Sequence, residues 1–340
     1  MVLQRLDVLS KTVAVDLGTS TVRVWERGKG LVAEHPHYLA VDTTSQKILA
    51  FGKDAQEMLG RVAANVKVFR PVQRGQVWDV AVEKAFLQAA LKDVLGKSFF
   101  SPTLLLSVPA TLSHAIEDET VQLGYSLGAR EVLTAAAPLA AAIGAGMRVA
   151  DASGGFILQL GAGVNEAGVV SLGSLVGVEA SQQAGEYFEQ LVITALKESH
   201  RVSVSMEVAR MLIQTLVTLS EASTGSVLVT GKHEKTAAPK EIQVSAENLR
   251  QPAKQMAEGY VQLVKKLLTK IPTELTVDIV DKGLLLAGGG AKLTGLEEYL
   301  VPKLGVPVSV VDEPERAVIR GLGTIVDHLD EFRRSLSYQV

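Results

Sequence analysis

The 340-residue sequence contains no cysteine, few aromatic residues and no large excess of either charge. Without cysteine there is no disulfide framework and no thiolate chemistry, which is consistent with a reducing compartment. The formal net charge of −3 provides no global basic surface and argues against nucleic acid as a partner. The apolar runs are too short to span a bilayer, and the charged N-terminus lacks a cleavage-site pattern. We therefore expect a cytoplasmic protein.

What the sequence does contain is length and many small apolar residues. A chain of 340 residues is too long for one ordinary hydrophobic core, so we expect two domains. An apolar content of 47% with only 5% aromatic residues suits an α/β protein rich in Ala, Val and Leu.

Apolar periodicity and glycine positions predict the same order of elements in both halves of the chain. The predicted strands cover residues 12–25, 31–42, 104–108, 131–135, 155–172 (a hairpin), 226–244, 283–287 and 307–311. The predicted helices cover residues 53–60, 80–95, 111–127, 138–146, 181–198, 205–218 and 246–270, with two more beginning near 294 and 315.

A glycine-containing hairpin occurs twice. Residues 13–24 (VAVDLGTSTVRV) form a strand, a tight polar turn and a strand, and residues 156–166 (FILQLGAGVNE) repeat that shape. Gln159 stands where the first copy has Asp16. A third glycine turn, at residues 288–291, follows a strand and leads into a helix. Because glycines let backbone N–H groups approach a phosphate, we predict a nucleotide held between two similar halves.

The connection after each turn distinguishes among phosphate-binding folds. In dinucleotide-binding and Walker-type loops, the strand runs through the glycine turn into a helix. Here Val22, Val24 and Trp25 continue the first turn as a strand. Two phosphate hairpins followed by a strand–glycine–helix element fit the actin, sugar-kinase and heat-shock chaperone superfamily. The sequence offers no candidate catalytic aspartate for a sugar kinase.

Over residues 12–332 the chain resembles the MreB family, the bacterial actins of rod-shaped cells. The resemblance rests on RGKGLV at 27–32, FRP at 69–71, AAAIGAG at 140–146 and DIVDKG at 278–283. It implies an α/β, actin-like and ribonuclease H-like two-domain fold, with a nucleotide cleft between duplicated domains.

The resemblance also implies domain boundaries. The first domain would cover residues 1–147 plus a C-terminal helix at 321–340, with a small subdomain near 33–70. The second would cover residues 148–320, with a small subdomain near 184–252.

The same resemblance assigns the nucleotide site to the glycine turns. Asp16 would hold Mg²⁺ through water, and the first turn would offer N–H and hydroxyl donors to phosphate oxygens. The predicted nucleotide-binding residues are Asp16, Gly18, Thr19, Ser20, Thr21, Gly161, Gly163, Gly185, Glu186, Gly288, Gly289, Gly290 and Ala291.

The chain departs from the family pattern at positions that carry catalysis. Gln159 replaces the second aspartate, and an amide lacks the negative charge that positions Mg²⁺ or its water. Ala137 stands at the position of the water-activating glutamate and can neither orient nor deprotonate water. Ile213 and Thr215 stand where the family has charged contacts to the base and ribose. We therefore expect no catalytic residue, at most weak binding of ATP or ADP with Mg²⁺, and a pseudo-ATPase.

The MreB family also has an apolar loop that dips into the membrane surface. Phe99 and Phe100 match this loop by position and predict a membrane contact. Two adjacent Phe residues in a tight polar turn cannot both point inward, although rings that cap the core are the alternative. Residues 2–9 place four apolar side chains on one helical face, an interfacial helix or else a disordered terminus.

The resemblance implies a subunit of membrane-associated filaments that act in cell shape, peripheral at the inner face of the cell membrane. The expected partners are further copies of the chain, the membrane surface, an intact MreB, and cell-wall or division proteins. Two alternatives stay open: an active polymerising ATPase, and a pseudo-actin adaptor that does not polymerise.

Overall fold

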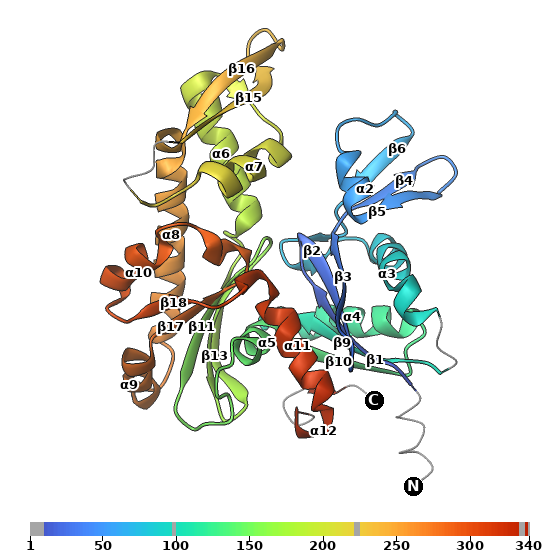
Figure 1. The fold of residues 1–340 in the computed structure, drawn as a ribbon, viewed down its shortest axis with the longest axis vertical. Coiled ribbons are helices and arrows are strands. Elements are labelled where there is room, and N and C mark those ends of the chain that lie inside the picture. Colours follow the sequence, from blue (N-terminus) through green and yellow to red (C-terminus); the bar gives the residue numbers. More distant parts are fainter. Residues whose placement is uncertain (1–9, 97–99, 221–224, 333–336, 339–340) are drawn as a thin grey trace.

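The computed structural model describes residues 10–96, 100–220, 225–332 and 337–338, and Figure 1 shows two large sheets side by side. The first has six strands in the order β19-β10-β9-β1-β2-β3. Its strands are β1 (Thr12–Leu17), β2 (Thr21–Glu26), β3 (Gly30–Pro36), β9 (Thr103–Val108), β10 (Glu131–Ala136) and β19 (Ser337–Tyr338). Every residue of β9 is buried, as expected for a central parallel strand covered on both faces.

The second large sheet repeats this pairing pattern with five strands in the order β13-β12-β11-β17-β18. Its strands are β11 (Gly155–Leu160), β12 (Asn165–Ser171), β13 (Ser174–Ser181), β17 (Leu284–Ala287) and β18 (Val308–Val310). In both sheets an antiparallel hairpin, β1–β2 or β11–β12, lies beside a parallel strand. The predicted duplication of the two halves is thus present in the sheet topology.

Two helices, α5 (Ala137–Gly144) and α11 (Ala317–Asp327), lie between the sheets (Figure 1). Their apolar side chains share one core with residues of both sheets, among them Leu105 and Ile157. The helices cross at Gly144 and Gly321, where a Cβ atom would lie 1.9 Å and 1.7 Å from a backbone oxygen of the other helix. Only glycine permits this approach, so these two residues set the distance between the helices.

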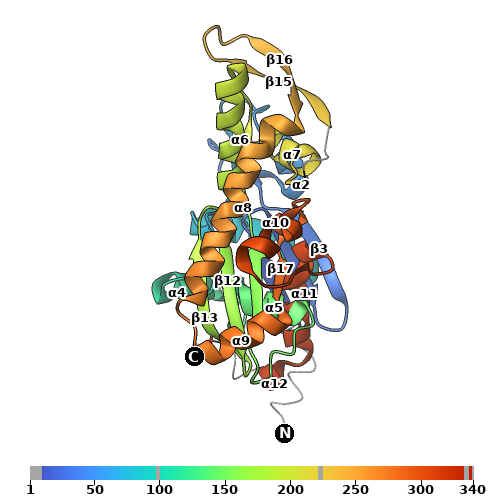
Figure 2. The ribbon, with the colours of Figure 1, turned by 90° about the vertical axis from the view of Figure 1, so that its left-hand side faces the viewer.

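Further helices cover the outer faces. On the first sheet these are α3 (Val80–Leu95) and α4 (His114–Ser126). The second half has α6 (Gly185–His200), α7 (Met206–Leu216), α8 (Ala246–Leu268), α9 (Thr273–Lys282) and α10 (Leu296–Leu304). In the side view, α8 runs from the β15–β16 end of the molecule towards α9 (Figure 2). Its predicted apolar stripe of Met256, Tyr260, Val264 and Leu267 is buried. Within the described residues, no helix is both long and apolar enough to cross a membrane.

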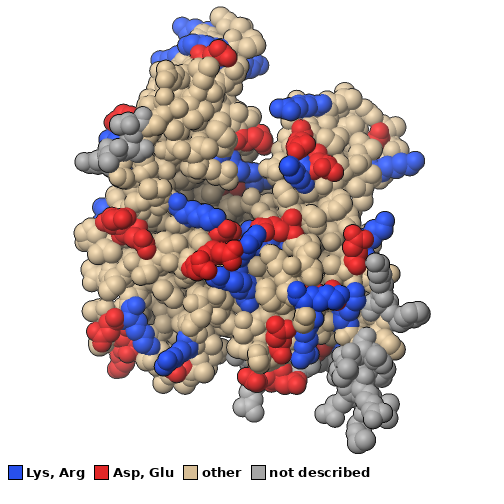
Figure 3. Space-filling view, viewed as in Figure 1, with Lys and Arg blue, Asp and Glu red and all other residues tan. Residues whose placement is uncertain are grey.

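Each half also carries a small sheet at the same end of the molecule (Figure 1). The first combines β4 (Leu39–Asp42), β5 (Ile48–Phe51) and β6 (Val66–Phe69) with α2 (Gly52–Glu57), and the second combines β14 (Val202–Ser203), β15 (Ser226–His233) and β16 (Pro239–Ser245). A two-stranded hairpin, β7 (Val72–Gln73) and β8 (Gln76–Val77), follows the first small sheet. In the space-filling view the surface is hollowed between the two lobes that carry the small sheets (Figure 3).

The sequence prediction missed the strands β5, β6, β7, β8, β13 and β14, and it differs from the structure in two further segments. Helix α9 was not predicted because the apolar residues Leu275, Val277 and Ile279 fall at every second position, a spacing typical of a strand. The expected C-terminal helix at 321–340 is not continuous: α11 ends at Asp327, α12 covers Leu329–Phe332, and the backbone of β19 pairs with β10. This pairing satisfies backbone groups at the edge of the first sheet, a gain that no helix pattern reveals.

Candidate nucleotide-binding site

The two predicted phosphate hairpins have the same backbone geometry. A Cβ atom at Gly18 would lie 2.5 Å from the Thr21 carbonyl oxygen, and one at Gly161 would lie 2.4 Å from the Val164 carbonyl oxygen. Each turn therefore needs glycine at its first position, for the same reason. The strand registers match as well, because Arg23 lies opposite Asp16 in the first hairpin as Glu166 lies opposite Gln159 in the second.

The two hairpins meet at Gly163. A Cβ atom there would lie 2.3 Å from the Thr19 hydroxyl oxygen and 2.5 Å from the backbone nitrogen of Gly75. That nitrogen also donates a hydrogen bond of 3.2 Å to the Thr19 hydroxyl. Gly163 is therefore required by the close approach of the two halves of the molecule, apart from any contact with a phosphate.

A cavity of about 610 Å³ lies between the hairpins and the triple glycine turn. Its size falls within the roughly 300–1,000 Å³ typical of small-molecule sites. All predicted nucleotide-binding residues except Glu186 and Ala291 line it, and Ala137 lines it too. The structure thus gathers three separate sequence motifs around one space, while their contact with a nucleotide stays a prediction.

Glu186 instead joins the two halves beside the cavity. Its carboxylate forms an ion pair of 3.1 Å with Arg70 and accepts a 3.2 Å hydrogen bond from the backbone nitrogen of Arg74. Ala291 is buried in the hydrophobic core of the second half of the chain. Neither position was distinguishable from its neighbours in the sequence, because adjacent residues of one motif point in different directions once the turn has formed.

Helix α7 contributes a cation to the cavity that the sequence prediction missed. Arg210 lines the cavity, donates from Nε to Glu189 at 2.7 Å, and donates from Nη1 to the Tyr38 hydroxyl at 2.8 Å. Burial opposes its charge, but Glu189 and Tyr38 outweigh burial and raise the pKa of the guanidinium. Ile213 also lines the cavity, whereas Thr215 is exposed and hydrogen-bonds to its own helix.

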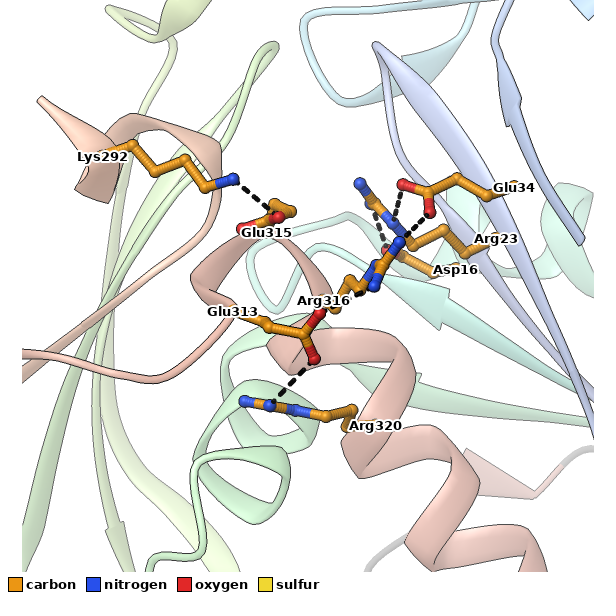
Figure 4. A network of polar contacts seen from close by, with 8 residues as sticks. All are labelled: Asp16, Arg23, Glu34, Lys292, Glu313, Glu315, Arg316 and Arg320. Atoms are coloured by element: carbon orange, nitrogen blue, oxygen red, sulfur yellow. Dashed lines mark hydrogen bonds and ion pairs between the residues drawn. The ribbon is translucent and has the colours of Figure 1, made fainter. Parts of the chain in front are cut away.

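Asp16, the predicted Mg²⁺ ligand, already has a positively charged neighbour. Arg23 Nη1 lies 3.5 Å from Asp16 Oδ2, Arg23 Nε donates to Glu34 at 3.0 Å, and the Ser107 hydroxyl donates to Asp16 Oδ1 at 3.0 Å. Figure 4 shows Arg23 between the two carboxylates, with Arg316 reaching Glu34 from the other side. Burial raises the pKa of the Asp16 carboxyl, although Arg23 and Ser107 oppose this effect.

The residues around Asp16 do not fit a resident Mg²⁺ ion. The described part of the chain contains no group of three or more His, Cys, Asp or Glu side chains placed to hold a metal. On the second hairpin, the buried Oε1 atom of Gln159 has no hydrogen-bond partner and carries no net charge. The predicted metal ligand Asp16 thus already has the guanidinium of Arg23 at 3.5 Å.

Glu166 is a second cavity residue that the sequence prediction missed. It is fully buried, and its Oε1 atom accepts a 2.7 Å hydrogen bond from the backbone nitrogen of Ala110. Burial raises its pKa to about 8, although backbone hydrogen bonds from Ala110 and Thr111 partly oppose this shift. Glu166 is thus largely protonated at neutral pH.

Glu166→Gln should remove a pH dependence of stability. The folded-state pKa of about 8 lies above the ordinary value of 4.5, so the carboxyl stabilises the fold fully below pH 4.5. That contribution is lost as the pH rises to about 8. Melting temperatures measured between pH 5 and pH 9 should fall more steeply for the wild type than for the variant. The exposed Glu298→Gln serves as control, and parallel curves for wild type and Glu166→Gln would contradict the assignment.

Two similar halves, each with a glycine hairpin facing a shared cavity, define an actin-like two-domain protein. The family model described as MreB/Mbl protein matches residues 10–334. The chain therefore belongs to the MreB/Mbl family, which confirms the resemblance found in the sequence.

Individual relatives agree over nearly the whole chain. The cell shape-determining protein Mbl of Bacillus subtilis is 29% identical over 97% of this chain and 100% of its own length. Among solved structures, MreB 5 of Spiroplasma citri bound to AMPPNP has a TM-score of 0.90 at 22% identity, covering 96% of this chain and 98% of that one. The MamK double helical filament has a TM-score of 0.78 at 18% identity, covering 94% and 99%. These similarities confirm the predicted actin-like fold.

Proposed function

We propose that this chain is a cytoskeletal subunit that assembles into filaments at the inner face of the cell membrane and acts in cell shape. The observation that carries the proposal is the match to Mbl, a cell shape-determining protein, over 97% of this chain and 100% of that protein. The likeness to MamK supports self-assembly. That protein forms a double helical filament, and the structural match covers 94% of this chain and 99% of MamK.

The proposal includes an adenine nucleotide in the cavity, bound weakly and not hydrolysed. The hairpin turns and the triple glycine line the cavity as a phosphate site requires, and the similar MreB 5 of Spiroplasma citri is bound to AMPPNP. The absence of carboxylates at Ala137 and Gln159 is the reason to expect no turnover. The function of the fold is then to form filament contacts, and not to catalyse ATP hydrolysis.

Membrane association rests on the segment between α3 and β9. Phe99 lies outside the described residues, whereas Phe100 is 40% exposed. A fully buried Phe ring contributes roughly 1.5–3 kcal/mol, so one loop binds a bilayer weakly. A filament presents many such loops at once, and their effects multiply through high effective concentration.

Co-sedimentation distinguishes the filament proposal from its alternatives. We expect the purified protein to pellet at high speed and to co-sediment with liposomes mainly when assembled. Replacing both Phe99 and Phe100 by Ser should abolish liposome binding while the protein stays folded and still pellets. Val301→Ser, an exposed apolar position on α10 with the same 40% exposure, is the matched control.

Each other outcome supports a different function. A protein that stays in the supernatant under all conditions would favour the adaptor. Pelleting coupled to ATP turnover would favour the active polymerising ATPase. If the double variant is markedly destabilised and the wild type ignores liposomes, the rings belong to the core and the membrane contact is wrong.

A further inference from the structure

Three adjacent strands place an acid, a base and an acid in one row beside the cavity. In the strand registers Arg23 of β2 lies opposite Asp16 of β1 on one side and opposite Glu34 of β3 on the other. The side chains follow these registers, with 3.5 Å from Arg23 to Asp16 and 3.0 Å to Glu34. All three strands belong to the first phosphate hairpin and its neighbour, so the row is built into the sheet.

The row of Asp16, Arg23 and Glu34 is also held in place by a residue from the second half of the chain. Arg316, just before α11, forms ion pairs with Glu34 at 3.0 Å and with Glu313 at 2.7 Å (Figure 4). Glu34 is thereby shared between two guanidinium groups, which keeps its oxygen on Arg23. The third guanidinium nitrogen of Arg23, Nη2, makes no hydrogen bond with the described residues. The Arg23 side chain itself lines the cavity.

The second hairpin shows what the same position looks like without a cation. There Gln159 replaces Asp16, and Glu166 replaces Arg23 at the equivalent cross-strand position. The charged acid–base pair of the first hairpin is thus specific to that hairpin and is not a general requirement of the turn. It places a guanidinium group, paired with two carboxylates, at the cavity wall of the first hairpin.

Two other carboxylates at the cavity are matched in the same way, whereas the buried Glu166 accepts a hydrogen bond from a backbone N–H group. Glu189 pairs with Arg210 at 2.7 Å, and Glu315 pairs with Lys292 at 2.6 Å. Asp16, Glu189 and Glu315 therefore each already have a cationic partner, which for Asp16 is Arg23. A second cation there would meet a guanidinium at contact distance in a partly desolvated site, where charge repulsion is strong.

We propose that Arg23 replaces the divalent cation at Asp16, so that the cavity takes a nucleoside polyphosphate as the metal-free anion. The inference rests on the proposed nucleotide binding and specifies its chemistry. Arg23, Arg210 and Lys292 line the cavity, each paired with a carboxylate, and would donate their remaining N–H groups to phosphate oxygens, for which the planar donors of guanidinium groups are well suited. A protein built in this way binds the free nucleotide anion, so Mg²⁺ lowers the apparent affinity by complexing that anion.

Calorimetric titration of the wild-type protein tests this without any substitution. Sodium ATP is titrated once in EDTA and once in excess MgCl₂, and we expect a lower apparent dissociation constant in EDTA, because Mg²⁺ competes with the site for the free anion. An apparent dissociation constant that is equal in the two buffers, or lower in MgCl₂, would overturn the role of Arg23 while leaving nucleotide binding intact. Absence of binding in both buffers would overturn the nucleotide site itself, so the two failures are distinguishable. Titration with MnCl₂ alone should show no binding at Asp16.

Substitution of Arg23 should create a requirement for metal that the wild type lacks. Arg23→Leu exposes Asp16 to the incoming phosphates, so affinity in EDTA should fall about tenfold and MgCl₂ should restore it. Arg61→Leu, an exposed arginine outside the cavity, is the control. Because Arg23→Leu leaves a buried carboxylate unpaired and can unfold the chain, Arg23→Lys is measured in parallel. That variant keeps the charge and should, like the wild type, bind ATP more tightly in EDTA than in MgCl₂; a Mg²⁺ requirement in it despite a native melting curve would contradict the proposal.

Discussion

Purified protein should release phosphate from ATP at a rate close to the background without protein. Ala137 lines the cavity at the position where the resemblance expects a water-activating glutamate, and a methyl group cannot accept a proton. Loss of a general base alone costs about 10²–10⁴-fold in rate. Gln159 removes a second carboxylate from the opposite hairpin, and its buried Oε1 has no partner that would orient it.

Steady-state phosphate release by a coupled assay measures this effect directly. An intact MreB-family protein prepared in the same way is the positive control. A second purification column removes contaminating ATPase from the sample of this chain and so guards against a false signal. Turnover comparable to the positive control would contradict the pseudo-ATPase assignment. Glu166, a buried carboxyl that lines the cavity, would then be the first candidate for the base.

Gly321→Ala should destabilise the protein by about 3 kcal/mol or more. The added methyl carbon would lie 1.7 Å from the Ala140 carbonyl oxygen, which is a backbone atom and cannot rotate away. Helices α5 and α11 would have to separate, and their shared core with both large sheets would open with them. For a chain of this size, such a loss lowers the melting temperature by several degrees or prevents accumulation of folded protein.

Gly259→Ala is the matched control for this prediction. Gly259 also lies inside a helix, α8, but a Cβ atom there would meet only the Gln183 side chain at 3.5 Å. Replacing a helical glycine by alanine without a clash gains about 0.5–1 kcal/mol. Chemical denaturation of both variants should therefore shift in opposite directions. Equal stability of Gly321→Ala and the wild type would mean that the two helices are not packed as closely as the structure has them.

Local patterns were sufficient to predict most of the fold. Strand alternation, helical periodicity and the glycine turns predicted most elements in their observed order, because these signals arise within a few residues of one another. The equivalence of Asp16 and Gln159 follows from two copies of one hairpin, and the strand registers agree with it. Helix α9 was missed, since the apolar residues Leu275, Val277 and Ile279 alternate with polar ones as in a strand.

The chemistry of the candidate site depended instead on contacts between distant segments. Arg23 lies opposite Glu34 only because a β-bulge between Val24 and Trp25 shifts the register, and alternation alone does not place that bulge. Arg210 reaches Tyr38 across 172 positions of sequence.

The sequence by itself thus determined the family, the duplicated hairpins and the loss of expected carboxylates, because each of these is a property of residue type at a position. Only the tertiary structure decided which charges face one another. Pairing energies depend on distance and burial, and both arise when the two halves of the chain close around the cavity.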